Sequence, residues 1–444
     1  MSDFQEEYVL RHPSSQKFFE EASAVTPGGV SHNLRFFPPY PLFVESASGN
    51  RLRDVDGNEY VDYWMGHFAL LLGHNPPPVV EALKDQLEHG LQWGIANPLE
   101  VRLAERVQRH VPCAEAVRFC NTGAEATMYA VRTARGYTGR TKVLKATGGW
   151  HGYSTDLLGA IHPPFEAPES LGLPAPFEAR VGTFPFNDPE GAASAIQREK
   201  DLAAVIVEPV LGAGGGIPPE PGFLQALREE TEAKDALLIF DEIITGFRLG
   251  LGGAQAHYGV TPDMVTLGKI LGGGLPVGAI AGKEEVMRWT SVTGPERDGL
   301  RVAVGGGTFS CNPMSMRAGL ATLEYLEAHQ DGYEGIGRMG EALREQAREV
   351  LASQGVPAVV AGVASLFQIH FLKEETNALQ SAEDVHRYTI PSRATEEFKV
   401  RMLNEGVHTM HGGGCLSFVH SGADVRGFLE ALSVAAGAMR GVAA

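Results

Sequence analysis

Two charged residues each follow an apolar segment in this sequence. Lys269 comes after residues 264–268 and precedes a glycine-rich loop, and Asp241 comes after residues 236–240. A lysine is seldom placed among apolar residues unless it is paired or its amine is used in chemistry. A desolvated amine can form a Schiff base, and a carboxylate can keep a pyridine nitrogen protonated. Together, these two groups are what pyridoxal phosphate requires of a protein.

A turn that could hold phosphate lies at residues 121–126, Asn-Thr-Gly-Ala-Glu-Ala, between a predicted strand and a predicted helix. The free N–H groups and the positive dipole end of such a helix can bind an anion. A helix that is merely capped by Thr122 is the alternative.

Further polar and aromatic residues also follow predicted strands. Trp150, next to His151, could stack on a planar ring or be an ordinary buried tryptophan. Glu208 ends the apolar segment 203–207, where a carboxylate is costly to desolvate without a partner; a solvated loop acid is the alternative. Because successive strands end in Glu208, Asp241 and Lys269, we predict an active site at the carboxyl ends of the strands.

Arg35 lies in an extended arm rich in phenylalanine and proline. Its guanidinium group could grip a substrate carboxylate, and a surface ion pair is the alternative. Neither glycine-rich segment, 212–217 or 268–274, fits a dinucleotide or nucleotide-triphosphate loop. There is no HExxH motif, and the 15 histidines are scattered along the sequence, so we expect no catalytic metal.

The composition excludes several classes of function. The net charge of −17 argues against binding to nucleic acid or to an anionic membrane, which require a basic surface. The sequence has neither an apolar segment of membrane-spanning length nor an apolar leader at its start. The four cysteines form no CxxC pair and are interpreted as free thiols. We therefore expect a cytoplasmic protein.

The order of the predicted elements indicates an α/β fold with a mainly parallel central sheet flanked by helices, plus a smaller α+β domain. Strands are predicted at 116–120, 142–145, 203–207, 237–240, 363–369 and 416–419. Helices are predicted at 16–24, 124–137, 313–329, 340–352 and 425–439, and a hairpin at 54–63. We expect an N-terminal arm and hairpin (1–65) that joins the small domain, a large cofactor-binding domain (66–315) and a C-terminal small domain (316–444). Residues 293–301 are a candidate linker.

With these residues in place, the sequence resembles the class III aminotransferases of pyridoxal-phosphate fold type I. The resemblance runs from about Gly28 to Leu432 and is most specific over 238–278. Supporting segments are Asn121–Ala126, Trp150–Gly152, Glu208–Pro209 and Gly307–Pro313.

The resemblance implies a role for each matching residue. Lys269 would be the Schiff-base lysine, and Asp241 the partner of the pyridine nitrogen. Gly123 and Ala124 would bind phosphate through their N–H groups with help from Thr122. Further cofactor contacts would come from Trp150 and Ile243 on the two faces of the ring, from His151 and Glu208 beside it, and from Thr308 toward the phosphate of a neighbouring subunit. The last contact implies a homodimer with shared sites, and Arg35 aligns with a substrate-carboxylate position.

Within the class, the sequence is most similar to glutamate-1-semialdehyde 2,1-aminomutase and to the β-amino-acid transaminases. The aminomutases carry a substrate-site glutamate near the C-terminus, whereas residues 407–417 contain no acid. This difference favours a transaminase that moves an amino group from a β-amino acid or amine to a 2-oxo acid. The alternatives are the aminomutase, another reaction of the same cofactor such as racemisation or decarboxylation, and a non-catalytic module that has kept the fold.

Overall fold

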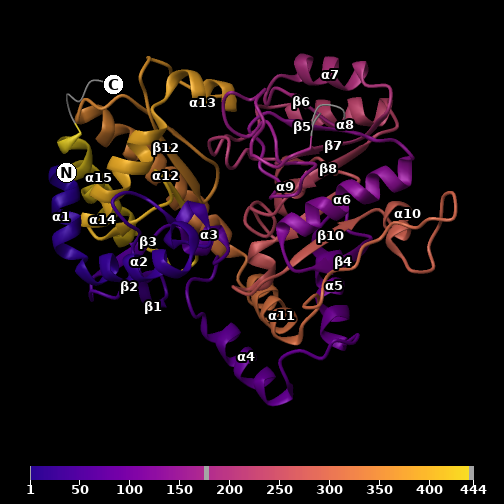
Figure 1. Cartoon of the computed structure of the whole chain (residues 1–444), viewed down its shortest axis with the longest axis horizontal. Coiled ribbons are helices and arrows are strands. Elements are labelled where there is room, and N and C mark those ends of the chain that lie inside the picture. Colours follow the sequence, from indigo (N-terminus) through magenta and orange to yellow (C-terminus); the bar gives the residue numbers. More distant parts are fainter. Residues whose placement is uncertain (1, 175–179, 440–444) are drawn as a thin grey trace. The chain divides into compact units, whose positions relative to one another are not determined.

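The computed structural model describes residues 2–174 and 180–439. The chain divides into two compact units (Figure 1). The large unit comprises Pro77–Glu334 and Leu379–Arg387, and the small unit comprises the described parts of the remainder.

The large unit is built on a seven-stranded sheet in the order β4-β10-β9-β8-β7-β5-β6. Neighbouring strands from β9 to β6 are parallel, and β10 runs antiparallel to both β9 and β4. The mainly parallel sheet predicted from the short apolar segments is therefore confirmed. The strands are β4 (Ala116–Cys120), β5 (Lys142–Ala146), β6 (Val181–Phe184), β7 (Leu202–Val207), β8 (Leu237–Asp241), β9 (Met264–Gly268) and β10 (Gly278–Gly282).

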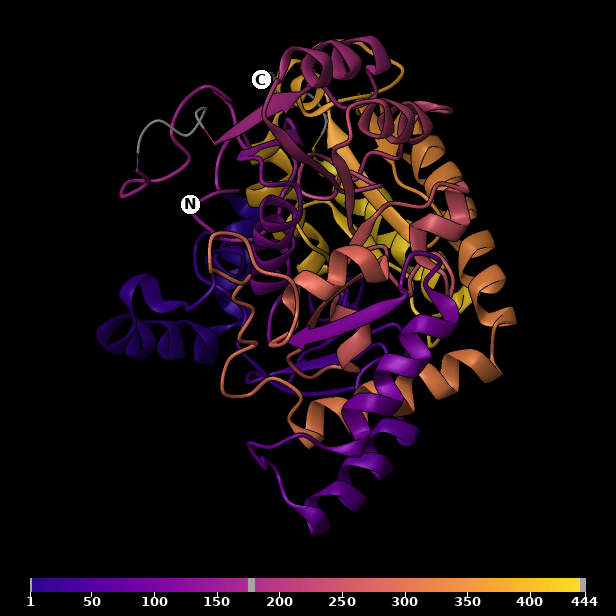
Figure 2. The same ribbon diagram turned by 90° about the vertical axis from the view of Figure 1, so that its right-hand side faces the viewer.

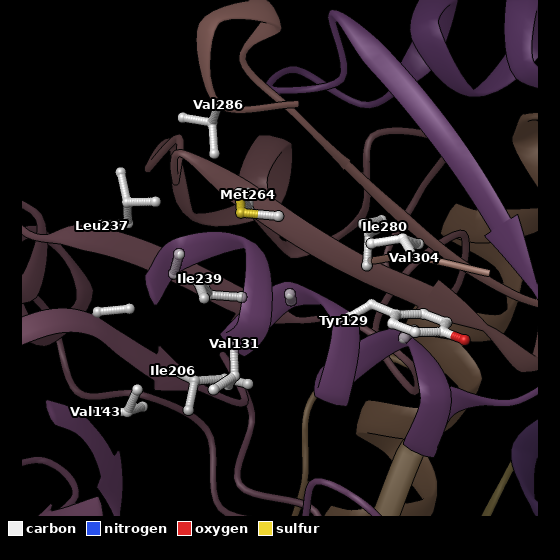
Figure 3. Close-up of a cluster of buried hydrophobic side chains, with 14 of the residues drawn as sticks. Tyr129, Val131, Val143, Ile206, Leu237, Ile239, Met264, Ile280, Val286 and Val304 are labelled. Atoms are coloured by element: carbon white, nitrogen blue, oxygen red, sulfur yellow. The ribbon is translucent and has the colours of Figure 1, made fainter. Parts of the chain in front are cut away.

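The core of the large unit lies between this sheet and helix α6 (Gly123–Thr138). Every residue of β7, Leu-Ala-Ala-Val-Ile-Val, is buried, as expected for a strand covered on both faces. Figure 3 shows Val131 of α6 beside Ile206 and Ile239 of the strands, and Tyr129 of the same helix on the side of Ile280 and Val304. This packing fixes the start of α6 relative to the strand ends.

The other helices of the large unit surround the sheet. Helix α11 (Pro313–Ala328) packs against α4 (Pro77–His89) and α5 (Pro98–His110), and these helices lie side by side in both views (Figures 1 and 2). The remaining helices are α7 (Pro189–Arg198), α8 (Phe223–Ala233), α9 (Gly253–Tyr258), α10 (Glu284–Met287) and α13 (Ala382–Tyr388).

The small unit contains two sheets, β1-β2-β3-β13 and β11-β12-β14. Strand β13 pairs in parallel with β3, which joins the C-terminal part of the chain to the N-terminal hairpin. The strands are β1 (Val44–Ser48), β2 (Arg51–Asp54), β3 (Glu59–Asp62), β11 (Ala358–Ala361), β12 (Leu366–Phe371), β13 (Val407–His408) and β14 (Gly413–Cys415). The helices are α1 (Asp3–Arg11), α2 (Pro13–Val25), α3 (Met65–Phe68), α12 (Asp331–Ser353), α14 (Lys399–Asn404) and α15 (Gly422–Ala438).

Several predicted boundaries differ from the structure. Residues 66–76 lie in the small unit, and residues 316–334 lie in the large unit because α11 packs on α4 and α5. The candidate linker 293–301 lies inside the large unit and contains a bridge between Arg297 and Leu300. The strand predicted at 416–419 is wrong: the pairing with β12 is made by 413–415, where glycines allow close approach. Among the described residues, no helix has the length and apolar character needed to cross a membrane.

Candidate active site

Lys269 stands where β9 ends and is the first residue of a 3-10 turn, Lys269–Gly272. Its φ of +46° lies in the left-handed region, which is uncommon for a residue with a side chain and recurs at functional sites. The side chain is partly exposed, and its amine forms no hydrogen bond or ion pair with any described residue. Burial lowers the pKa of Lys269, although the carboxyl groups of Asp241 and Glu208 oppose this effect. The amine is therefore available as a nucleophile or base.

Asp241 ends the neighbouring strand β8 and is only 4% exposed. Its Oδ2 lies 2.7 Å from His151 Nδ1, and its Oδ1 accepts hydrogen bonds from Thr266 Oγ1 at 2.8 Å and from Ile243 N at 3.2 Å. Burial lowers the pKa of His151, although Asp241 opposes this effect. A neutral His151 that donates from Nδ1 satisfies the carboxylate, since an ionised carboxylate only accepts. Three donors thus hold one carboxylate at the end of the strand.

The predicted phosphate turn begins α6. Thr122 is the N-cap: its Oγ1 accepts a hydrogen bond from Glu125 N, while Glu125 Oε2 accepts from the backbone N–H groups of Thr122 and Asn121. This capping box leaves the backbone N–H groups of Gly123 and Ala124 without a partner in the described part of the chain. The helix is capped and still presents two donors at its positive end, which is a favourable arrangement for binding phosphate.

Two glycines allow neighbouring segments to approach this turn. A Cβ atom at Gly123 would lie 3.0 Å from Ile243 Cδ1, and one at Gly152 would lie 2.6 Å from the Cβ atom of Ala124. Ile243, which lies two residues after Asp241, and Gly152, which lies two residues after Trp150, are therefore both packed against the start of α6. The structure thus brings the predicted phosphate turn, ring-stacking loop and carboxylate into one site.

Glu208 holds the loop that carries Trp150. Its Oε1 accepts a hydrogen bond from Trp150 N at 2.8 Å, and its Oε2 accepts from Gly212 N at 3.2 Å. Burial raises the pKa of Glu208 to about 8, and the nearby Asp241 carboxylate acts in the same direction. Glu208 is therefore a buried carboxyl group and not a solvated loop acid. The ring of Trp150 is partly exposed and packs edge-on against Tyr153, with the ring centroids 4.7 Å apart.

Lys145 is a buried charged residue beside the site that the sequence reasoning missed. It is fully buried in β5, and its Nζ donates to Gly149 O at 2.6 Å and to Gly159 O at 2.7 Å. Its only signal in the sequence is a charge in the otherwise apolar segment 143–146. Because two carbonyl groups hold its amine, Lys269 is the better nucleophile of the two lysines.

Two predicted residues lie away from this cluster. Thr308 is exposed, and its carbonyl oxygen accepts a hydrogen bond from Gln92 Nε2 at 2.5 Å. Arg35 is exposed in the small unit, and its guanidinium group has no hydrogen bond or ion pair with a described residue. The surface ion pair considered as an alternative for Arg35 is therefore not formed.

Histidines that are scattered in the sequence come together in the small unit. The rings of His67, His408 and His411 lie 4.3, 5.5 and 6.3 Å from that of Trp64, and His32 lies 5.0 Å from His67. Within the described ranges, no group of histidine, cysteine or acidic residues could hold a metal ion. The positions of these histidines in the sequence are too far apart to predict that their rings lie close together.

The site of the large unit fits pyridoxal phosphate. It combines the unpartnered amine of Lys269, the two free N–H groups at the start of α6 and the carboxylate of Asp241. A fold of this topology with these groups at its strand ends defines a pyridoxal-phosphate enzyme of fold type I. The chain belongs to the class III aminotransferase family, whose model matches residues 36–421.

Similar proteins include both isomerases and transaminases. A glutamate-1-semialdehyde 2,1-aminomutase of Methanosarcina acetivorans is 41% identical over 94% of this chain and 97% of its own. Among solved structures, an omega-transaminase from Sphaerobacter thermophilus has a TM-score of 0.89 and 34% identity, covering 98% of this chain and 100% of its own. A β-phenylalanine aminotransferase from Variovorax paradoxus has a TM-score of 0.88 and 32% identity, with coverages of 99% and 97%.

Proposed function

We propose that this pyridoxal-phosphate enzyme is a glutamate-1-semialdehyde 2,1-aminomutase, which moves an amino group from C2 to C1 of a single substrate. The observation that carries the proposal is the 41% identity to an aminomutase over 94% of the chain, which exceeds the 34% and 32% identities to the two transaminase structures. The sequence pattern alone made the aminomutase an alternative to a transaminase. The identity to known aminomutases makes it the first candidate.

The residues of the large unit divide the work in this proposal. When bound, pyridoxal phosphate supplies an aldehyde that condenses with amines and a ring that withdraws electrons from the amine-bearing carbon. Lys269 would provide the amine that holds the cofactor and would then remove and return the proton at the carbon that carries the amino group. Gly123 and Ala124 would donate their N–H groups to the phosphate. Trp150 and Ile243 would contact the ring.

Asp241 would keep the proton on the pyridine nitrogen. Donors from Thr266 and Ile243 orient its carboxylate, and His151 donates to its other oxygen. Because His151 is buried and favours its neutral form, it can orient Asp241 without competing as a fixed positive charge. The proton on the cofactor is therefore the partner that balances the charge of Asp241.

Arg35 would bind the carboxylate of the substrate. Its guanidinium group is exposed and unpaired among the described residues, and such a group can form two parallel hydrogen bonds with a carboxylate. In steady-state kinetics, Arg35→Ala should raise the KM for a carboxylate substrate and leave turnover of a simple amine unchanged. An equal effect on both substrates would refute this role.

A transaminase is the second candidate because of one local feature. The segment in which aminomutases carry a substrate-site glutamate here contains Gly412, Gly413 and Gly414. A side chain at Gly413 would collide with Gln368, one at Gly414 would come within 2.7 Å of Tyr63 O, and Gly412 has a φ of +86°. The backbone therefore has no room for an acidic side chain at these three glycines without rearrangement.

We also propose a homodimer in which Thr308 reaches the phosphate site of the other subunit. Leu91, Trp93, Ile95 and Phe309 all expose large apolar side chains, and the Gln92–Thr308 hydrogen bond joins the two loops that carry them. Exposed large apolar side chains on two joined loops are typical of a protein interface.

A cytoplasmic location is proposed as well, supported by the four free cysteines, three of which are buried. Cell fractionation with an antibody to the protein would test it.

The deciding experiment supplies purified holoenzyme with glutamate-1-semialdehyde and no second substrate. An aminomutase forms 5-aminolevulinate, Lys269→Ala lowers the rate at least ~10²–10⁴-fold, and Lys200→Ala, which changes an exposed lysine of the same unit, does not. No 5-aminolevulinate, together with release of a β-keto acid from β-phenylalanine and a requirement for a 2-oxo acid to continue, would transfer the assignment to a transaminase. If the wild-type holoenzyme shows neither activity, both candidate functions are contradicted.

A further inference from the structure

Lys145 occupies an unusual environment for a charged side chain. It has no exposed surface, and no described carboxylate lies within ion-pair distance of its ammonium group. The ammonium group is held by the carbonyl oxygens of Gly149 and Gly159 instead. Burying an ammonium group without an opposite charge is costly, so a lysine at this position must contribute what an apolar side chain could not.

The two carbonyl groups belong to the loop that follows β5. Gly149 precedes Trp150 directly, and Gly159 lies further along the same connection. Trp150 N donates to Glu208, and Thr127 Oγ1 donates to His151 O at 2.6 Å. Lys145 thus fastens the loop at its start while Glu208 and Thr127 hold it from the sheet and from α6.

Burial lowers the pKa of Lys145 to about 7, although the charges of Glu208, at the end of β7, and Glu169, in the connection after β5, oppose this effect. The loop that Lys145 holds carries His151, which contacts Asp241, and Trp150, which donates to Glu208. Lys145 is therefore connected to the cofactor position through these hydrogen bonds.

We propose that Lys145 is a positioning residue of the cofactor site, which clamps the loop of Trp150 and His151 through its hydrogen bonds to Gly149 and Gly159. The proposal depends on the cofactor class of the protein and is independent of whether the reaction is an isomerisation or a transamination. Lys145 does not react itself, because both carbonyl groups hold its amine.

Two substitutions test the clamp. Lys145→Met removes both donated hydrogen bonds, whereas Lys145→Gln retains a hydrogen-bond donor. Lys142→Met is the matched control, since Lys142 lies on the same strand but is partly exposed near Glu199, outside the site. The measurement is the circular dichroism of the bound cofactor in each holoenzyme.

The cofactor dichroism should weaken in Lys145→Met and stay close to wild type in Lys145→Gln. Lys142→Met should match wild type. Unchanged dichroism in the folded Lys145→Met holoenzyme would overturn the clamp. If Lys145→Met does not fold, the clamp is tested by Lys145→Ala in the same measurement.

Discussion

Two buried carboxyl groups of the site have different surroundings. Asp241 receives donors from Thr266, Ile243 and His151. Glu208 receives two backbone N–H groups, and burial together with the charge of Asp241 raises its pKa to about 8.

The state of Glu208 predicts a pH dependence of stability. Its pKa is about 8 in the folded chain against an ordinary value of 4.5, so the folded state binds the proton more tightly. The stability from protonated Glu208 is fully present below pH 4.5 and is lost as the pH rises toward 8, by at most ~1.4 kcal/mol per pH unit. In thermal melts of the cofactor-free protein, the melting temperature of Glu208→Gln should therefore rise relative to that of the wild type as the pH increases from 5 to 8.

The comparison should use Glu220→Gln as its control, because Glu220 is an exposed acid of the same unit. Parallel wild-type and Glu208→Gln curves across this range would mean that Glu208 is ionised in the folded protein.

At the residue scale, the sequence indicated the reactive groups but not their partners. Lys269 and Asp241 could be predicted because each directly follows an apolar segment, where a charged residue is uncommon. The contacts of Asp241 with His151 and of Glu208 with the loop of Trp150 join residues about 60 to 90 positions apart. Such contacts depend on the strand order in the sheet, which the sequence pattern does not specify.

Secondary-structure elements place these groups through a few close approaches. Helix α6 begins at Gly123, one residue before the predicted start. Its start could be predicted this closely because the capping box at Thr122 and Glu125 is a local signal. By contrast, Met65, Gly66, His67 and Phe68 all have positive φ values between +48° and +66°, a left-handed turn for which non-glycine residues give no local signal. The first feature could be predicted, and the second is imposed by tertiary packing.

The approach of Gly152 to α6 yields a prediction at this scale. A Cβ atom there would lie 2.6 Å from the Cβ and 2.7 Å from the Cα of Ala124, so Gly152→Ala must displace the start of the helix. We expect cofactor affinity to fall roughly tenfold or more, because the N–H donors at this helix end would be misaligned. Equilibrium dialysis of pyridoxal phosphate against the reconstituted protein measures the change.

Gly259→Ala separates the steric effect from backbone strain. Gly259 has a φ of +68°, and a Cβ atom there would meet nothing within 4 Å, whereas Gly152 has a φ of +82°. Both substitutions therefore strain the backbone, but only Gly152→Ala creates a collision. Equal loss of cofactor affinity in both variants would show that the contact with Ala124 is unimportant.

At the scale of the whole chain, the two units are not consecutive segments. The small unit draws on three separate segments, and Leu379–Arg387, which contains most of α13, belongs to the large unit although its flanking residues do not. The boundary after Pro76 lies within the run Pro76–Pro78, whereas no linker composition marks the two ends of Leu379–Arg387. The order of the predicted elements indicated a large and a small domain, but packing of α11 and α13 decides where each unit ends.

The proposed homodimer gives the prediction at this scale. Ile95 is 75% exposed and lies between the exposed Trp93 and the capped start of α5. An aspartate at this position would be buried without a partner in the dimer, and a buried unpaired charge at an interface costs several kcal/mol. Ile95→Asp should therefore convert a dimer into a monomer in analytical ultracentrifugation. Leu171→Asp, a change at an exposed leucine on a different loop, should remain dimeric.

The dimer also connects to the cofactor through Thr308. If Thr308 completes the phosphate site of the other subunit, the Ile95→Asp monomer should bind pyridoxal phosphate more weakly than the wild type. Thr308→Ala should show the same weakening while it remains a dimer, because only one hydroxyl group is lost. A monomeric Ile95→Asp with wild-type cofactor affinity would show that each subunit holds its cofactor alone, and a monomeric wild type would contradict the interface itself.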